Sequence, residues 1–106
     1  MDANEIMELE AEIVKTLKTI FDPEIPVNIY DLGLIYAIDV DDDTRVVIKM
    51  TLTAPNCPMA DQLLNEVFEK TNMIDGVKSA KVNLVFDPPW DKSLMSEEAM
   101  LDLGLL

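Results

Sequence analysis

The sequence contains one cysteine, Cys57, within the stretch from Thr51 to Ala60. A run that favours β-structure, Arg45 to Thr53, precedes Pro55, which cannot donate a hydrogen bond to a β-ladder, and a helical pattern begins after Pro58. The spacing predicts a strand-to-helix turn with Cys57 as the helix N-cap. The N–H groups at a helix N-terminus favour a thiolate, so this position would make the cysteine reactive. Alternatively, a lone cysteine is a small buried apolar residue without a chemical role.

A second candidate region is the segment from Asp22 to Gly33, which has two prolines, several large apolar residues and no regular period. It predicts a long ordered loop, and such loops often bind ligands. If the loop closes over the edge of the sheet where Cys57 lies, Asp22 and Glu24 come near the thiol. A thiol with nearby carboxylates is typical of a metal or sulfur site.

Composition excludes several other kinds of site. Without histidine the chain has no base for cysteine-protease chemistry, and its three unclustered glycines form no phosphate-binding loop. Asp39, Asp41 and Asp43 match the first ligand positions of an EF-hand, but Thr44 replaces the required glycine and Met50 the required glutamate. This acidic segment is therefore predicted to be a solvated turn.

The elements that position these residues follow from apolar periodicity. One apolar stripe predicts a helix over residues 5–20, and alternation predicts strands over 34–40, 45–53 and 77–86. The apolar face is expected to carry Leu34, Tyr36, Ile38 and Val40 in the first strand and Val46, Ile48, Met50 and Leu52 in the second. Further helices are expected from Pro58 to about Asn72 and from Ser96 to Leu103. A right-handed crossover makes the third strand parallel to the second. We therefore predict a single domain over residues 1–106, an α/β (α+β) two-layer sandwich in the order α-β-β-α-β-α. Its three-stranded sheet is mixed, or split around the first strand.

Charge and composition limit the partners and the compartment. A net charge of −13 repels nucleic acid and anionic membrane surfaces. No apolar run is long enough to span a bilayer, and the N-terminus lacks the basic start of a signal peptide. One cysteine forms no internal disulfide, so this acidic protein is expected in the cytoplasm.

Trp90 follows two prolines and is the only tryptophan. Such a residue either anchors a loop onto the core or forms part of a surface that binds a partner. The sequence leaves both alternatives open.

Four segments together resemble the SufT-like metal-sulfur cluster biosynthesis family, whose relatives include PaaD and the eukaryotic cytosolic iron-sulfur targeting factors. They are Asp22–Glu24, Tyr30–Tyr36, Thr51–Pro58 and Phe86–Trp90. The resemblance implies a fold like that of iron-sulfur scaffold domains and a role in maturing iron-sulfur proteins. The chain lacks the cysteine-rich extension of the PaaD branch and the nucleotide-binding domain of the cluster-carrier ATPases, so a stand-alone SufT-like factor is the expected match.

The resemblance also implies a site in which Cys57 contacts the metal, with Asp22, Glu24, Thr51 and Thr53 around it. A cluster normally needs four protein ligands, and the chain has one thiol. We therefore expect only a transient iron-sulfur cluster or iron, to which a symmetric homodimer would supply two thiols.

The leading hypothesis is a non-enzymatic auxiliary factor that uses Cys57 for transient cluster, iron or sulfur contact while it docks assembly proteins and apo client proteins. The alternative is an adaptor that binds the same assembly partners, with a structural Cys57. A thiol enzyme is a third, weaker hypothesis.

Overall fold

The computed structural model describes residues 2–54 and 60–105. Its elements are α1 (Ala3–Leu17), β1 (Ile35–Val40), β2 (Arg45–Met50), α2 (Ala60–Asn72), β3 (Ser79–Leu84), the 3₁₀ turn η1 (Lys92–Leu94) and α3 (Glu97–Asp102). The strand order is β1-β2-β3, with β1 antiparallel and β3 parallel to β2. The predicted fold class is thus confirmed: the sheet is mixed, and the central position of β2 means that it is not split around the first strand.

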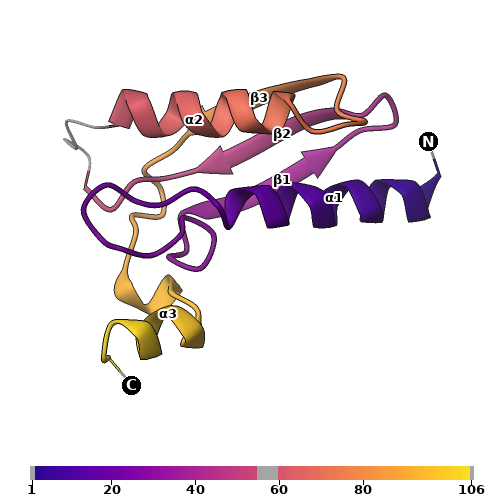
Figure 1. Ribbon diagram of the computed structural model, residues 1–106. Coiled ribbons are helices and arrows are strands. Elements are labelled where there is room, and N and C mark those ends of the chain that lie inside the picture. The colour runs from indigo at the N-terminus through magenta and orange to yellow at the C-terminus, as the bar shows by residue number, and fades with distance from the viewer. Residues whose placement is uncertain (1, 55–59, 106) are drawn as a thin grey trace.

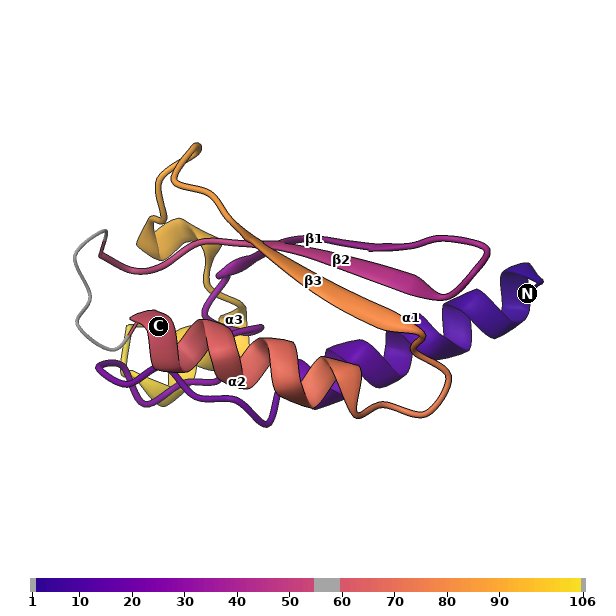
Figure 2. The ribbon, with the colours of Figure 1, turned by 90° about the horizontal axis from the view of Figure 1, so that it is seen from above.

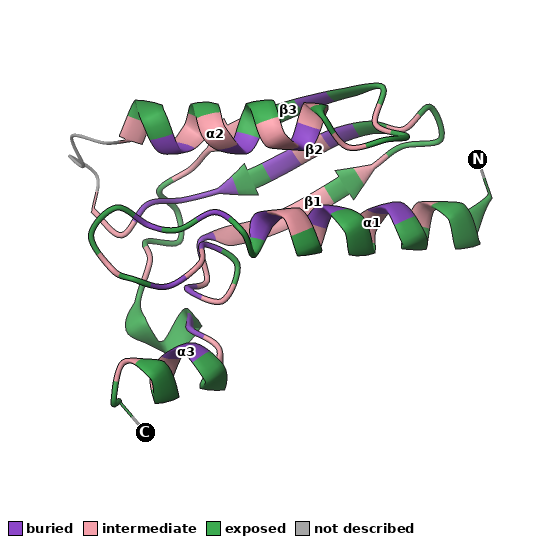
Figure 3. Ribbon diagram, in the orientation of Figure 1, coloured by how far each residue is buried: buried purple, intermediate pink, exposed green. Residues whose placement is uncertain are grey.

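The two layers are visible in Figure 2, where α1 and α2 lie on one side of the sheet. Alternation along β2 explains this arrangement, because Val46, Ile48 and Met50 are buried while Arg45 and Lys49 are exposed. Figure 3 shows the buried positions along β2 and on the inner faces of the two helices. Each large apolar side chain removed from water in this core contributes about 1.5–3 kcal/mol.

The two long helices cover that apolar face. From α1 the buried residues are Leu9, Ile13 and Leu17, and from α2 they include Leu63 and Val67. Phe68, one residue beyond Val67, is 45% exposed and lines an open pocket between α2 and β3 with Leu64 and Val82. No helix within the described ranges combines the length and apolar character needed to cross a bilayer.

The first helix is shifted relative to its prediction over residues 5–20, because it begins at Ala3 and ends at Leu17. At its C-terminus the Thr19 N–H donates to the Thr16 carbonyl oxygen at 3.0 Å, and the Ile20 N–H donates to the Leu17 carbonyl oxygen at 3.2 Å. These bonds span three residues, so the last turn tightens and the α-helix stops. Ile20 is still buried, as its apolar character indicates.

The strands are also shorter than their apolar runs. β2 was expected to reach Thr53 but ends at Met50, after which the Thr51 N–H still donates to the Leu34 carbonyl oxygen at 2.9 Å. β3, expected over residues 77–86, spans Ser79–Leu84, because the Val77 N–H turns back to the Ile74 carbonyl oxygen.

A bulge in β1 changes which residues face the core. Ile38 and Val40 pair with Ile48 and Val46 as the alternation predicts, but the register shifts between residues 35 and 37. As a result Ile35, not Tyr36, pairs with Met50 and packs against the core. The expectation that Tyr36 would share the apolar face was therefore wrong.

Candidate functional site

One end of the sheet brings together most of the residues that the sequence singled out. β2 ends at Met50 and α2 begins at Ala60, and the loop between α1 and β1 lies at the same end of the molecule (Figure 1). Cys57 lies outside the described residues, so its N-cap position and its thiolate stay predictions. The site is therefore built from the segments on either side of residues 55–59.

Asp22 organises the loop that follows α1. Asp22 is buried, and its Oδ1 accepts hydrogen bonds from the backbone N–H groups of Glu24 at 2.9 Å and Ile25 at 2.8 Å. Its own N–H donates to the Val27 carbonyl oxygen at 3.2 Å. A carboxylate with two backbone donors closes the turn around Pro23, so Asp22 has a defined structural task at this end of the sheet.

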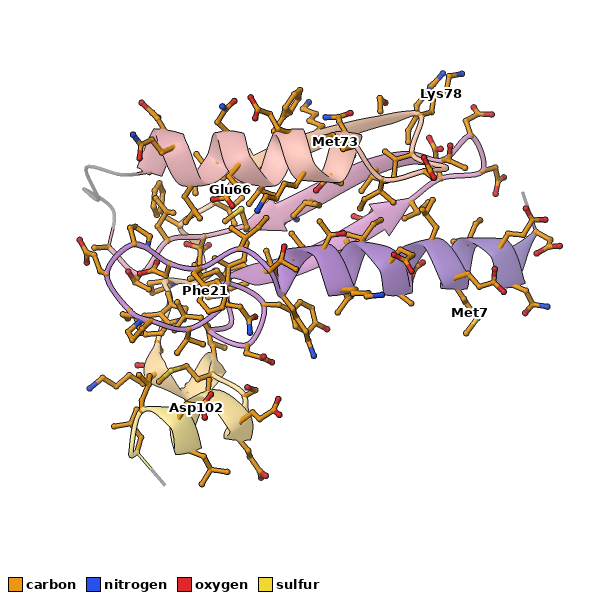
Figure 4. The ribbon with its side chains drawn as sticks, viewed as in Figure 1. Met7, Phe21, Glu66, Met73, Lys78 and Asp102 are labelled. Atoms are coloured by element: carbon orange, nitrogen blue, oxygen red, sulfur yellow. The ribbon has the colours of Figure 1, made fainter. Side chains whose placement is uncertain are left out.

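The same loop lies against the first half of α2. A small cavity of about 80 Å³ is lined by Phe21 and Pro23 from the loop and by Gln62, Leu63 and Glu66 from the helix. Figure 4 shows the Phe21 and Glu66 side chains in the space between these two segments. The loop therefore does approach the edge from which α2 starts, as the sequence suggested, and Glu24 is exposed beside it.

Thr51 and Thr53 continue the chain beyond β2. Thr51 is fully buried, and its Oγ1 has no hydrogen-bond partner within the described residues. Thr53 is half-buried. Burying a hydroxyl without a partner costs about 1–3 kcal/mol, so the Thr51 hydroxyl is an unused donor and acceptor at this end of β2.

The carboxylates do not form a coordination sphere by themselves. Asp61 lies in the first turn of α2 and is exposed, as is Glu24. Within residues 2–54 and 60–105, no three histidine, cysteine, aspartate or glutamate side chains lie close enough together to hold a metal ion. The structure thus gathers Asp22, Glu24, Thr51 and Thr53 at one end of the sheet without joining them in one cluster.

The segment after β3 forms the other wall of this end. The Trp90 Nε1 donates to the Leu32 carbonyl oxygen at 2.8 Å, and the Tyr36 hydroxyl donates to the Pro88 carbonyl oxygen at 2.7 Å. The Trp90 side chain is half-buried against the core. Its role as a loop anchor is therefore confirmed.

Just beyond Trp90, Asp91 caps η1 by accepting a hydrogen bond from the Ser93 N–H at 3.0 Å. Hydrogen bonds from Ser93, through its side chain and then its backbone, lower the pKa of the Asp91 carboxyl. Its charge is therefore kept at the start of η1, next to the anchored tryptophan.

Sequence reasoning missed the contact between Gly33 and η1. A Cβ atom on Gly33 would lie 2.4 Å from the Leu94 carbonyl oxygen, and the φ of Gly33 is +88°. Only glycine fits such a close approach of two backbones. The glycine at the end of a proline-containing loop was the available signal, but nothing in the sequence names its partner.

Comparisons with known proteins agree with this architecture. The model of the family described as iron-sulfur cluster assembly protein matches residues 10–84. An Fe-S protein maturation auxiliary factor of Porphyromonas gingivalis is 55% identical over 103 residues, covering 97% of this chain and 98% of its own. The Fe-S protein maturation auxiliary factor SufT of Staphylococcus aureus is 38% identical over 86 residues, covering 81% and 98%.

Among solved structures, a domain of unknown function from Bacillus anthracis superposes with a TM-score of 0.87 at 36% identity. The match covers 94% of this chain and 95% of that one. Sequence and fold therefore agree along nearly the whole chain, which belongs to the iron-sulfur cluster assembly protein family as a SufT-like member.

Proposed function

We propose that the chain is an auxiliary factor that assists iron-sulfur cluster assembly or the transfer of clusters to client proteins. In this proposal Cys57 makes transient contact with a cluster, with iron or with sulfur, which is the cargo and not a resident cofactor. Relatives that match 97% and 81% of this chain are named as Fe-S protein maturation auxiliary factors, which supports a non-enzymatic role in this process.

One structural observation carries the proposal: the described segments that flank residues 55–59 supply oxygen atoms at a single end of the sheet. Glu24 and Asp61 are exposed there, and the Thr51 hydroxyl lacks a partner within the described residues. Asp22 holds the loop in place through the backbone N–H groups of Glu24 and Ile25. We infer that Asp22 shapes the site, while Glu24, Thr51 and Thr53 surround the cargo.

The number of ligands makes the contact transient. A protein-held cluster needs about four ligands, mostly thiolates, and this chain offers one thiol. Two copies in a symmetric dimer would offer two, and low-molecular-weight thiols would complete the set. A cluster with replaceable ligands is easily passed on, which suits transfer to an apo client.

An adaptor role is the second candidate, and the geometry of Asp22 favours it. Because Asp22 Oδ1 already accepts two backbone N–H groups, its carboxylate serves the shape of the loop whether or not a metal binds. In the adaptor hypothesis the loop from Asp22 to Tyr36 and the acidic surface bind assembly proteins, and Cys57 is structural.

The test is anaerobic reconstitution of the wild type and Cys57→Ala with iron, sulfide and glutathione, followed by visible absorption and native mass spectrometry. The proposal expects a chromophore that depends on Cys57, carried by a dimer, and its loss on transfer to an apo acceptor. Circular dichroism should show the same fold for both proteins.

Two results would overturn the carrier role. If neither protein binds iron or a cluster, or if Cys57→Ala binds and delivers as much as the wild type, Cys57 is not the contact. An apo client matured equally well by both proteins would then support the adaptor.

A further inference from the structure

The face of the sheet opposite α1 and α2 carries no helix along its three strands in the described part of the chain (Figure 2). Pairing places Asp39, Val47 and Lys81 in one cross-strand row and Ala37, Lys49 and Asn83 in the next. Arg45 pairs with Ser79 on the same side. These residues are exposed or half-buried. Together they form an accessible surface, here called the open face.

The charge of the open face is opposite to that of the whole chain. The chain has 21 acidic and 8 basic residues, yet the open face carries Arg45, Lys49 and Lys81 against the single carboxylate of Asp39. Lys81 is the diagonal cross-strand neighbour of both Arg45 and Lys49, and strand geometry puts the Cα atoms of such neighbours about 8 Å apart. The one ion pair between described side chains, Lys70 with Glu66, lies on α2, and the three bases of the open face are exposed. Lys81, on the edge strand, also lines a pocket with Asp61 of α2.

A groove adjoins these bases. It has a volume of about 620 Å³ and is lined by Lys49, by Tyr36 and Tyr30, and by Pro88 and Leu94, with Asp87 adding a carboxylate. The Tyr36 hydroxyl is fixed by its bond to the Pro88 carbonyl oxygen, and Leu94 is 42% exposed. Apolar and aromatic walls beside a cation suit a segment that presents both carboxylates and an apolar side chain.

We propose that the open face docks an acidic segment of a partner protein, whose carboxylates contact Arg45, Lys49 and Lys81 and whose apolar side chain enters the adjoining groove. This inference goes beyond the proposed function, because it concerns the face opposite the helices and requires neither Cys57 nor any cargo. The negative charge elsewhere on the chain repels such a segment, so productive contact is confined to this face and its orientation is fixed.

Charge also decides between this occupant and a second copy of the chain. A two-fold dimer through the open face would set the three bases of one copy against those of the other, which is unfavourable. An acidic segment brings the opposite charge and is therefore the occupant that the surface fits.

The test uses a fluorescent peptide in which glutamate and leucine alternate, together with the same peptide carrying glutamine in place of glutamate. Binding is followed by fluorescence anisotropy, and the contacted residues are mapped by amide chemical shifts of the isotope-labelled chain. The variant is Lys49→Glu/Lys81→Glu. Its matched control, Lys15→Glu/Lys70→Glu, makes the same change of charge on α1 and α2, on the other side of the sheet.

The proposal expects the glutamate peptide to bind, with shift changes on β1, β2 and β3, and expects Lys49→Glu/Lys81→Glu to weaken it at least about tenfold. The control variant and Cys57→Ala should bind as the wild type does. An absence of binding, equal binding of the glutamine peptide, or equal loss in both charge variants would overturn it. A dimer in native mass spectrometry that Lys49→Glu/Lys81→Glu disrupts would assign the face to a second copy instead.

Discussion

Both ends of the sheet have an aspartate that accepts two backbone N–H groups and a glycine with positive φ, but the surroundings differ. At the site end, Asp22 Oδ1 accepts two backbone N–H groups and Gly33 has a positive φ. At the far end, Asp41 Oδ1 accepts the N–H groups of Asp43 and Arg45, both at 2.9 Å, and Gly76 has a positive φ of 97°. The difference lies in burial, because Asp22 is 7% exposed whereas Asp41 is exposed to solvent.

This difference in burial separates the end that we propose as the site from the far end within the described residues. The turn at Asp41 is exposed over residues 41–43, which confirms the predicted solvated turn. The loop that begins at Asp22 instead packs beside Leu63 of α2 across a small cavity. At its other end, the carbonyl oxygens of Leu32 and Leu34 accept hydrogen bonds from Trp90 Nε1 and from the Thr51 N–H. A rigid loop keeps oxygen atoms in place at the end of β2, which a solvated turn does not do.

The largest expected difference is between Gly33→Ala and Gly76→Ala. At Gly33 a Cβ would lie 2.4 Å from the Leu94 backbone, whereas at Gly76 the nearest atom is the Leu9 Cδ1 at 3.7 Å. Both changes strain a positive φ, at about 1 kcal/mol, but the first also forces η1 away from the loop, so we expect a total loss of about 3 kcal/mol or more. Urea denaturation of both variants measures the difference, and equal losses would contradict the close packing of loop and η1.

Much of this architecture follows from particular sequence patterns. The alternation of Val46, Ile48 and Met50 predicts which face of β2 is buried, and the burial confirms it. The β1 bulge was missed because apolar residues continue through Ile35 and Tyr36, so periodicity gives no sign that one residue is extra.

The candidate site was harder to predict than the fold. A carboxylate in a loop looks the same in sequence whether it binds a metal or caps a turn. The role of Asp22 in closing its turn can therefore be recognised only from its hydrogen bonds. The loop of residues 22–33 was predicted, but its contact with α2 depends on packing between segments far apart in the chain.

A second expected difference concerns the two capping aspartates. Asp22→Ala leaves the N–H groups of Glu24 and Ile25 without their acceptor in a partly buried loop, so we expect a loss of about 2–3 kcal/mol. Asp41→Ala leaves the N–H groups of Asp43 and Arg45 to bond with water, so we expect a smaller loss of stability, about 0.5–1 kcal/mol. Asp22→Asn keeps an Oδ1 acceptor and should restore most of the stability. Thermal and urea unfolding of the three variants decide the matter, and similar losses for both alanine variants would mean that burial does not separate the two ends.

The smallest expected effect in stability is the most informative for function. Thr51 and Thr71 are both fully buried, and in both the Oγ1 lacks a hydrogen-bond partner within the described residues. Thr51 follows β2 at the site end, whereas Thr71 lies near the C-terminus of α2. Replacing either by valine keeps the shape and removes an unpaired hydroxyl, so each change should leave stability unaltered or raise it by up to about 1 kcal/mol.

The two valine variants should differ only if the Thr51 hydroxyl serves the cargo. In anaerobic reconstitution we expect Thr51→Val to hold less of the Cys57-dependent chromophore than the wild type, while Thr71→Val holds as much. Because both proteins would be at least as stable as the wild type, a loss confined to Thr51→Val cannot come from unfolding. Equal chromophore in both variants would leave the Thr51 hydroxyl with no part in binding, and the cargo would then depend on the remaining residues around Cys57.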